Sequence, residues 1–295
     1  MKALVLGGGG ARGALQVGAL RALVEAELQP DLLVGTSIGA LNATYLCLHG
    51  CSHAGLDSLE EAWQDAAEAD LLPDNYLWLT LRALVRRRDP GVEERIRDFF
   101  VGHGLSPDLR FGQLPGPRLV LVAADLAAGR PVLYGNNPDG SVLQAVLAST
   151  AIPPWVQPQT VDGQLLIDGG LVSNLPIEPA LAEGAKEIVA LDLVDPRPPK
   201  LAEHGPGAFV FQMLNTMERR QIELECALAE ARGVPLHDVK LRAGSPIAVW
   251  EFSRSPALVQ PGYEIMQRYL EQHPELGHAQ AGLPWWQRLL QRRDR

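Results

Sequence analysis

A serine flanked by glycines is the first candidate for covalent chemistry in the sequence. Ser37 stands in GTSIG, Gly35 to Gly39, between the apolar run DLLV and the helical pattern IGALNATYLCL. In a G-x-S-x-G turn from a strand into a helix, the glycines relieve crowding and leave the serine Oγ exposed at the head of the helix. The pattern makes Ser37 a candidate nucleophile, with a serine that only caps the helix as the alternative.

A glycine loop, GGGGARG, follows the apolar run KALVL near the N-terminus. It fits a dinucleotide site, a phosphate cradle or an oxyanion hole, because each needs backbone N–H groups at the start of a helix. A dinucleotide site needs an acidic residue at the end of the second strand, whereas Asp31 precedes that strand, and a phosphate loop needs a lysine that is absent. An oxyanion hole remains, with the N–H groups of Gly8, Gly9 and Gly10 as donors.

A nucleophilic serine needs a group that accepts its proton. None of the histidines lies at an expected strand end; they are His49, His53, His103, His204, His237, His273 and His278. Carboxylates do lie at the ends of expected strands, at Asp125, Asp168 and Asp192. Asp168 stands in DGG, where two glycines allow an unusual turn and the close approach of other groups. Spacing alone leaves all three carboxylates open as the base.

Alternating strand and helix patterns predict an α/β fold with a mostly parallel central sheet flanked by helices. The strands are expected at Lys2–Leu6, Asp31–Gly35, Leu119–Leu126, Pro131–Gly135, Gln164–Gly170 and Glu187–Leu193. The sheet therefore reaches about residue 195, and residues 1–195 form the expected catalytic core. Residues from about 50 to 109 are helical and charged in patches, which indicates an insertion over the sheet.

The sequence pattern of the C-terminal third predicts that residues 196–280 form an extension that packs on the core. It begins with the linker DPRPPK, continues with a charged helix at Met213–Arg232 and contains VWEFSRS, a further strand or extended segment. Residues 281–295 form a basic amphipathic tail, suited to contact with anionic lipid or to docking on the protein itself. Asn75–Arg88 is a second candidate lipid surface, with a core-facing helix as the alternative.

The composition restricts the partners and the compartment. The 295 residues carry a formal net charge of −9, which argues against a nucleic-acid partner. Three cysteines are too few for a disulfide framework, and no signal-peptide core or membrane span is visible, so we expect a cytoplasmic protein with at most a peripheral membrane contact. Cys47, His49, Cys51 and His53 have an unfavourable spacing for zinc on a helix, and we expect no metal and no cofactor.

Four motifs occur in one order: GGGGARG, GTSIGALNA, ASTAIPP and DGGLVSNLP. Each resembles a block of the patatin-like phospholipase family, particularly its bacterial members related to the catalytic domain of neuropathy target esterase. The resemblance implies a Ser-Asp dyad without histidine, with Ser37 as nucleophile and Asp168 as proton acceptor, and it supports the glycine loop as oxyanion hole. The supporting residues are Arg12, Gly13, Gly35, Gly39, Gly169 and Gly170.

The resulting hypothesis is a serine lipid acyl hydrolase or esterase, of phospholipase A or lysophospholipase type, that acts on acyl-ester lipids through an acyl-serine intermediate. Two alternatives stay open. One is a non-catalytic lipid-sensing or regulatory scaffold that keeps the pocket. The other is an acyltransferase that uses the same serine, since a pocket that admits an alcohol passes the acyl group to it.

Overall fold

A computed structural model describes residues 1–69, 90–153, 156–195 and 206–277. The predictions for Asn75–Arg88, for the linker at 196–200 and for the tail at 281–295 lie outside these residues. Across the described residues, none of the helices combines the length and the apolar character that a membrane crossing requires.

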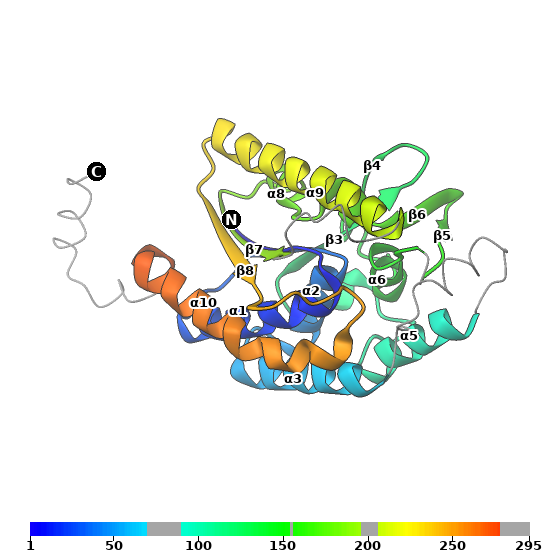
Figure 1. Cartoon of the computed structure of the whole chain (residues 1–295), viewed down its shortest axis with the longest axis horizontal. Coiled ribbons are helices and arrows are strands. Elements are labelled where there is room, and N and C mark those ends of the chain that lie inside the picture. The colour runs from blue at the N-terminus through cyan, green and yellow to red at the C-terminus, as the bar shows by residue number, and fades with distance from the viewer. Residues whose placement is uncertain (70–89, 154–155, 196–205, 278–295) are drawn as a thin grey trace.

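The described strands form one mixed, mostly parallel sheet in the order β5-β6-β3-β2-β1-β7-β8, with β4 paired to β3 (Figure 1). Pairing is parallel from β3 through β2, β1 and β7 to β8, and antiparallel among β3, β4, β5 and β6. The predicted fold class is therefore confirmed. The strands are β1 (Lys2–Leu6), β2 (Leu32–Thr36), β3 (Arg118–Asp125), β4 (Arg130–Tyr134), β5 (Gln159–Val161), β6 (Gln164–Asp168), β7 (Glu187–Val194) and β8 (Leu236–Arg242).

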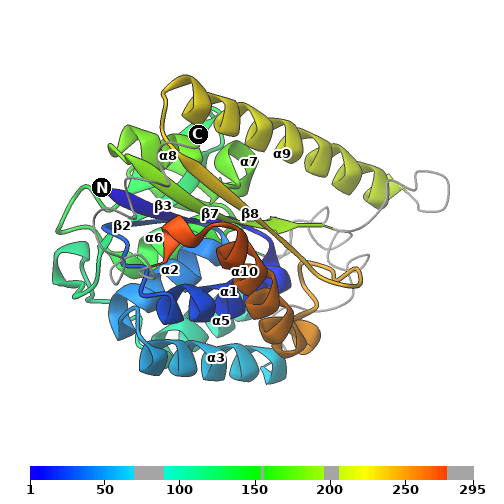
Figure 2. The same ribbon diagram turned by 90° about the vertical axis from the view of Figure 1, so that its left-hand side faces the viewer.

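Helices cover both faces of the sheet, because its central strands are apolar on both sides. In β1, Ala3 and Val5 face the layer of α8 and α9, whereas Leu4 and Leu6 face the layer of α1, α2, α3 and α10 (Figure 2). The helices are α1 (Ala14–Glu25), α2 (Ile38–His49), α3 (His53–Glu68), α5 (Pro90–Gly102), α6 (Val142–Ser149), α7 (Gly170–Ser173), α8 (Ile177–Ala182), α9 (Pro206–Ala231) and α10 (Val259–Gln272), with 3-10 turns η1 (Gly10–Gly13), η2 (Phe111–Gln113), η3 (Phe252–Leu258) and η4 (Pro274–Leu276).

The C-terminal third departs from the prediction in two places. The sheet does not end near residue 195, because β8 pairs in parallel with β7 along seven residues. In its sequence LHDVKLR, charged residues alternate with the buried Val239 and Leu241, as is common in an edge strand. The segment VWEFSRS is not a strand, since η3 begins at Phe252 within it.

Candidate active site

The turn between β2 and α2 holds Ser37 in a strained backbone conformation. Its φ is 55° and its ψ is −126°, a region that non-glycine residues rarely adopt. The two glycines of the motif permit the turn. A Cβ on Gly35 would lie 2.5 Å from the carbonyl oxygen of Gly39, and one on Gly39 would lie 2.2 Å from that of Leu6. The amide of Ser37 donates to the Oγ of Ser149 at 3.0 Å, which fixes the turn from the opposite side.

The sheet register brings Asp168 beside Ser37. Thr36 of β2 pairs with Val122 of β3, so Ser37 follows at the level of Ala123, the next residue of β3. On the other side of β3, Ala123 pairs with Asp168 of β6. The hydroxyl of Ser37 donates to Oδ2 of Asp168 at 2.6 Å. This is the hydrogen bond that direct proton transfer from serine to carboxylate needs.

Asp168 is held as a buried carboxylate. Its side chain is 3% exposed, and burial raises its pKa to about 6, against the opposing effect of hydrogen bonds from Ser37 and from the amide of Gly170. The Gly170 amide donates to Oδ1 at 2.8 Å, so Oδ2 is left to face Ser37. Both glycines of DGG are required by close approach, since a Cβ on Gly169 would lie 2.2 Å from the Val122 oxygen and one on Gly170 2.8 Å from Oδ1 of Asn174.

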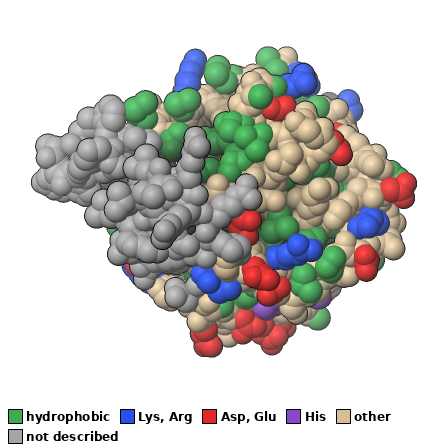
Figure 3. All heavy atoms as spheres, turned by 90° about the vertical axis from the view of Figure 1, so that its right-hand side faces the viewer, with side chains coloured by type: hydrophobic (Ala, Val, Ile, Leu, Met, Phe, Trp, Pro, Cys, Tyr) green, Lys and Arg blue, Asp and Glu red, His purple; other side chains and the backbone are tan. Residues whose placement is uncertain are grey.

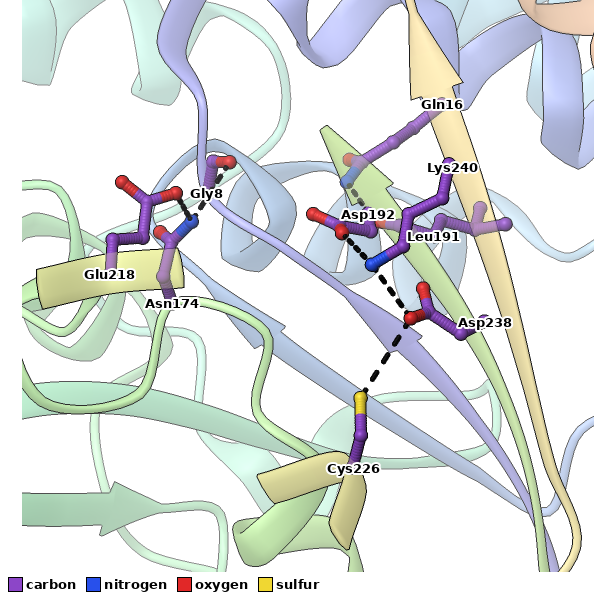
Figure 4. A network of polar contacts seen from close by, with 9 residues as sticks. All are labelled: Gly8, Gln16, Asn174, Leu191, Asp192, Glu218, Cys226, Asp238 and Lys240. Carbon is purple, nitrogen blue, oxygen red and sulfur yellow. Dashed lines mark hydrogen bonds and ion pairs between the residues drawn. The ribbon is translucent and has the colours of Figure 1, made fainter. Parts of the chain in front are cut away.

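The two other candidate carboxylates have structural partners. Asp125 accepts hydrogen bonds at 2.9 Å from the amides of Ala127 and Ala128, and thereby closes the turn after β3. Asp192 lies near the end of β7 and pairs with Lys240 of β8 at 2.6 Å (Figure 4). Of the three carboxylates, Asp168 is the one that the structure places against Ser37.

Hydrogen bonding of the glycine loop leaves two of the three predicted oxyanion donors, Gly9 and Gly10. The amide of Gly8 donates to the carbonyl of Asn174 at 3.0 Å, so the expectation that Gly8 offers a free N–H is wrong for this conformation. Gly9 and Gly10 both line the cavity beside Ser37, and no hydrogen bond of their N–H groups to another described residue is seen. Gly10 has a φ of 57° and lies so close to Val249 that a Cβ would meet its carbonyl oxygen at 2.1 Å.

A buried network of polar side chains from α1 and α2 holds the backbone of the glycine loop. The side-chain amide of Gln16 donates to the carbonyls of Gly7 and Leu191 and accepts from Asn42, which also donates to the carbonyl of Gly13. Each member is fully buried, and such networks hold backbone groups rigidly when every polar atom is paired. The loop is therefore fixed before any substrate arrives.

Arg12, one of the predicted supporting residues, is buried beside the glycine loop. It is 4% exposed, its Nε donates to the carbonyl of Gly9 at 3.2 Å, and its guanidinium lies 3.1 Å from Asp195. The side chain therefore orders the glycine loop. It also lines the cavity.

Ser37 and Asp168 open into a cavity of about 670 Å³, a size typical of small-molecule sites. The motif ASTAIPP contributes Thr150, Ile152 and Pro153 to the wall of this cavity. The side formed by α2, α3, α5 and η3 is apolar and consists of Ile38, Leu41, Leu59, Ala62, Trp63, Ala66, Ile96, Phe99, Phe100 and Phe252. Helix α9, on the other face of the sheet, contributes Asn215, Glu218 and Gln221 at helical spacing.

Glu218 and Asn174 are site residues that the sequence analysis missed. The side-chain amide of Asn174 donates to Oε1 of Glu218 at 2.5 Å and to the carbonyl of Gly8 at 3.4 Å, which links α9 to the glycine loop (Figure 4). Burial raises the pKa of Glu218 to about 7, while the charge of Arg12 opposes the shift. Asn174 stands in the motif DGGLVSNLP and could have been found there, whereas a glutamate in a charged helix carries no such signal.

The remaining candidates lie elsewhere. No histidine within the described residues lines the cavity. Cys47 is buried and its Sγ donates to the Pro117 carbonyl at 3.3 Å, while His49 stacks on Tyr45. Cys47, His49, Cys51 and His53 form no group of potential metal ligands in this part of the described chain.

The chain matches the family model described as Patatin-like phospholipase over residues 4–181. It is 33% identical over 195 residues to patatin-like phospholipase domain-containing protein 7 of Rattus norvegicus, which covers 65% of this chain and 13% of that protein. It is 34% identical over 196 residues to patatin-like phospholipase domain-containing protein 6 of Homo sapiens. That alignment covers 65% of this chain and 13% of the human protein. An uncharacterized NTE family protein of Mycobacterium tuberculosis is 35% identical over 190 residues, or 64% of this chain and 30% of that one.

The chain thus spans 30% or less of the length of these three relatives. Among solved structures, VipD from Legionella pneumophila aligns with 92% of this chain and 67% of its own, at a TM-score of 0.46 and 17% sequence identity.

Proposed function

Because the chain belongs to the patatin-like phospholipase family, we propose that it is a serine lipid acyl hydrolase in which Ser37 is the nucleophile and Asp168 its base. The hydrogen bond of 2.6 Å between Ser37 Oγ and Asp168 Oδ2 at the cavity wall is the observation that carries this proposal. The word phospholipase in the names of the family and of its mammalian relatives supports an ester of a lipid as substrate.

In the first step Ser37 Oγ attacks the ester carbonyl carbon while its proton passes to Oδ2 of Asp168. The carbonyl oxygen becomes an oxyanion, and the N–H groups of Gly9 and Gly10 at the start of η1 are the donors proposed to stabilise it. The C–O bond to the alcohol then breaks, and the protonated Asp168 gives the proton to the leaving oxygen.

In the second step water enters and Asp168, again a carboxylate, accepts a proton from it. The resulting hydroxide attacks the acyl-Ser37 carbonyl, and collapse of the tetrahedral intermediate releases the fatty acid and returns the proton to Ser37 Oγ. A pKa of about 6 suits both roles, because Asp168 is mostly ionised at neutral pH and is still a stronger base than an exposed aspartate.

The chemistry of the walls suggests how an ester lies in the cavity. The acyl chain fits the apolar side formed by α2, α3 and α5, since burying each CH₂ group there stabilises the complex by about 0.8 kcal/mol. The alcohol part then faces the polar side, where α9 presents Asn215, Glu218 and Gln221.

We place the proposed membrane contact at the mouth of this cavity. The mouth is lined by three large apolar side chains that are exposed to solvent: Leu171 (46% exposed), Leu214 (38%) and Met217 (63%). Apolar side chains exposed together mark a surface suited to contact with a membrane. Hydrophobic side chains also gather on the upper part of the face that carries β5, β6 and the first turns of α9 (Figure 3). Replacing Leu214 and Met217 together by Ser should weaken co-sedimentation with phospholipid vesicles much more than it slows hydrolysis of a dispersed short-chain ester.

Covalent labelling with a fluorophosphonate tests the proposed chemistry directly. We expect one adduct per chain on Ser37, located by intact mass and peptide mapping, absent in Ser37→Ala and formed much more slowly in Asp168→Asn. Labelling of Ser37→Ala at the same rate, or full esterase activity of that variant, would overturn the assignment. A folded protein that takes no label would point to the lipid-sensing scaffold instead.

Product analysis separates hydrolysis from acyl transfer. Incubation of a radiolabelled phospholipid with the enzyme, with and without added glycerol, should give free fatty acid as the acyl product in both cases. Accumulation of acylglycerol at the expense of fatty acid would show that an alcohol reaches the acyl-Ser37 intermediate before water does.

A further inference from the structure

Two histidines and a glutamate from the C-terminal third converge away from the cavity. His237 lies in the edge strand β8, His273 ends α10, and Glu275 lies in the following turn η4. One nitrogen from each histidine and one carboxylate oxygen of Glu275 all lie within 4.8 Å of one another. No other group of three potential metal ligands occurs within the four described ranges.

The geometry is close to that of a metal site. Bonds of about 2.0–2.2 Å to a tetrahedral zinc ion put its ligand atoms about 3.3 Å apart. His273 Nδ1 and Glu275 Oε1 are already 3.1 Å apart. The rings of His237 and His273 are 5.5 Å apart between centroids and nearly perpendicular, at 80°, so modest side-chain rotation brings the third ligand into place.

The backbone and a neighbouring ring hold the ligands in position. Pro274 follows the last turn of α10 and forces the chain to bend, which turns Glu275 back toward His273. Tyr269, one turn earlier in α10, stacks on His273 with the centroids 4.2 Å apart and the planes at 25°. His273 therefore has its ring plane fixed before a metal binds, as supported metal ligands do.

We propose that His237, His273 and Glu275 bind one divalent transition-metal ion, zinc by the chemistry of its ligands, which fastens the end of α10 to the edge strand β8. Two imidazoles and one carboxylate are a ligand set that zinc uses, and a water molecule completes the tetrahedron. All three ligands are partly or fully accessible to solvent, which gives the ion an entry path. None of them lines the cavity of Ser37, so the ion takes no part in ester chemistry.

Calorimetric titration of the tag-free, chelator-treated protein with ZnCl₂ tests the site. We expect one zinc per chain, at least tenfold weaker binding in His237→Ala and in His273→Ala, and unchanged binding in His53→Ala, which removes an exposed histidine of α3. Glu275→Gln, which keeps the shape of the side chain, should weaken binding less. Zinc should also raise the Tm of the starting protein and of His53→Ala, and it should leave that of His237→Ala unchanged.

Titration with Co²⁺ gives a second readout that does not depend on activity. A tetrahedral nitrogen and oxygen site produces intense visible absorption bands, which should be absent in the His237→Gln variant. Absence of saturable zinc binding, or zinc and cobalt binding that persists in a folded His237→Ala/His273→Ala protein, would overturn the proposal. Fluorophosphonate labelling of Ser37 in the same samples shows whether the active site is intact, so failure of one proposal is distinguishable from failure of the other.

Discussion

Two regions of the chain meet at the cavity and are built in different ways. The turns after β1, β2 and β6 bring backbone atoms together more closely than a Cβ allows, as at Gly39 and Gly169. The C-terminal region contributes mostly side chains to the cavity, such as Glu218 on α9 and Phe252 at the start of η3. Substitutions in the first region should therefore abolish activity or folding, whereas those in the second should have graded effects.

The largest effect should come from Asp168→Asn, which keeps the size of the base and removes its basicity. We expect kcat to fall by about 10³-fold or more, the range seen when a member of a catalytic group is lost in other serine hydrolases. In the starting enzyme, kcat/KM should rise with pH through about 6, as Asp168 loses its proton. Steady-state kinetics between pH 5 and pH 8 measure the fall in kcat of the variant and the pH dependence of kcat/KM in the starting enzyme. An Asp168→Asn variant that keeps half of the activity would contradict the role of Asp168 as base.

The same variant should be more stable than the starting protein at neutral pH. Burial raises the Asp168 pKa above its unfolded value, so the folded state favours the protonated form and its stability decreases as pH rises toward and past 6. A neutral amide escapes this cost, which is about 3 kcal/mol for a pKa raised from 3.8 to about 6, at about 1.4 kcal/mol per pKa unit. Urea unfolding at pH 8 and pH 5 should show a gain that is larger at pH 8.

Gly39→Ala tests the claim that close backbone approach builds the first region. The new Cβ would lie 2.2 Å from the Leu6 carbonyl oxygen, a clash with backbone that cannot rotate away, and should cost about 2–3 kcal/mol in the free energy of unfolding. Gly244→Ala in the C-terminal region is the matched control, because nothing lies within 4 Å of its Cβ position. Its effect should stay within about 0.5 kcal/mol.

This difference also explains what could be predicted from the sequence. A backbone contact that excludes a Cβ leaves a glycine behind, so the turns around Ser37 and the strands between them were visible as motifs. The choice of Asp168 over Asp125 and Asp192 was not visible, because it depends on the antiparallel register of β6 against β3. That register is a long-range property, and without the family resemblance the spacing leaves all three carboxylates open, although the two glycines of DGG favour Asp168.

The C-terminal region left weaker signals for a physical reason. An edge strand is half exposed, so β8 alternates charged and apolar residues over a short stretch and lacks the continuous apolar run of β1 or β7. Glu218 was hidden in the same way, since one carboxylate among many on a charged helix becomes distinctive only when α9 packs beside the cavity. Side-chain function of this kind follows from tertiary contacts rather than from local pattern.

Lys240→Met should have a moderate effect on stability and little effect on activity. Lys240 lies 2.6 Å from Asp192 and 2.7 Å from Asp238, and Asp192 is buried (Figure 4). Loss of the lysine leaves a buried carboxylate without its partner and should cost about 1–3 kcal/mol at pH 8. The deficit should shrink toward pH 5, because burial already raises the pKa of Asp192 and protonation removes its charge. An equal deficit at both pH values would contradict this explanation.

Glu218→Gln should have the smallest effect and is the sharpest test of the C-terminal contribution to the site. The ionised carboxylate accepts a charge-assisted hydrogen bond from Asn174, whose backbone oxygen in turn holds the amide of Gly8. Glutamine still accepts a hydrogen bond at this position, so kcat/KM at pH 8 should fall only a few-fold. Glu223→Gln, at an exposed position of the same helix, is the matched control.

The pH profile separates this positioning role from a purely structural one. In the starting enzyme kcat/KM should rise in two steps, near pH 6 for Asp168 and near pH 7 for Glu218, because each side chain acts in its ionised form. Glu218→Gln should lose the upper step and keep the lower one, whereas Glu223→Gln should keep both. A profile of Glu218→Gln that retains both steps would mean that α9 only covers the cavity, and that the first region alone sets the chemistry.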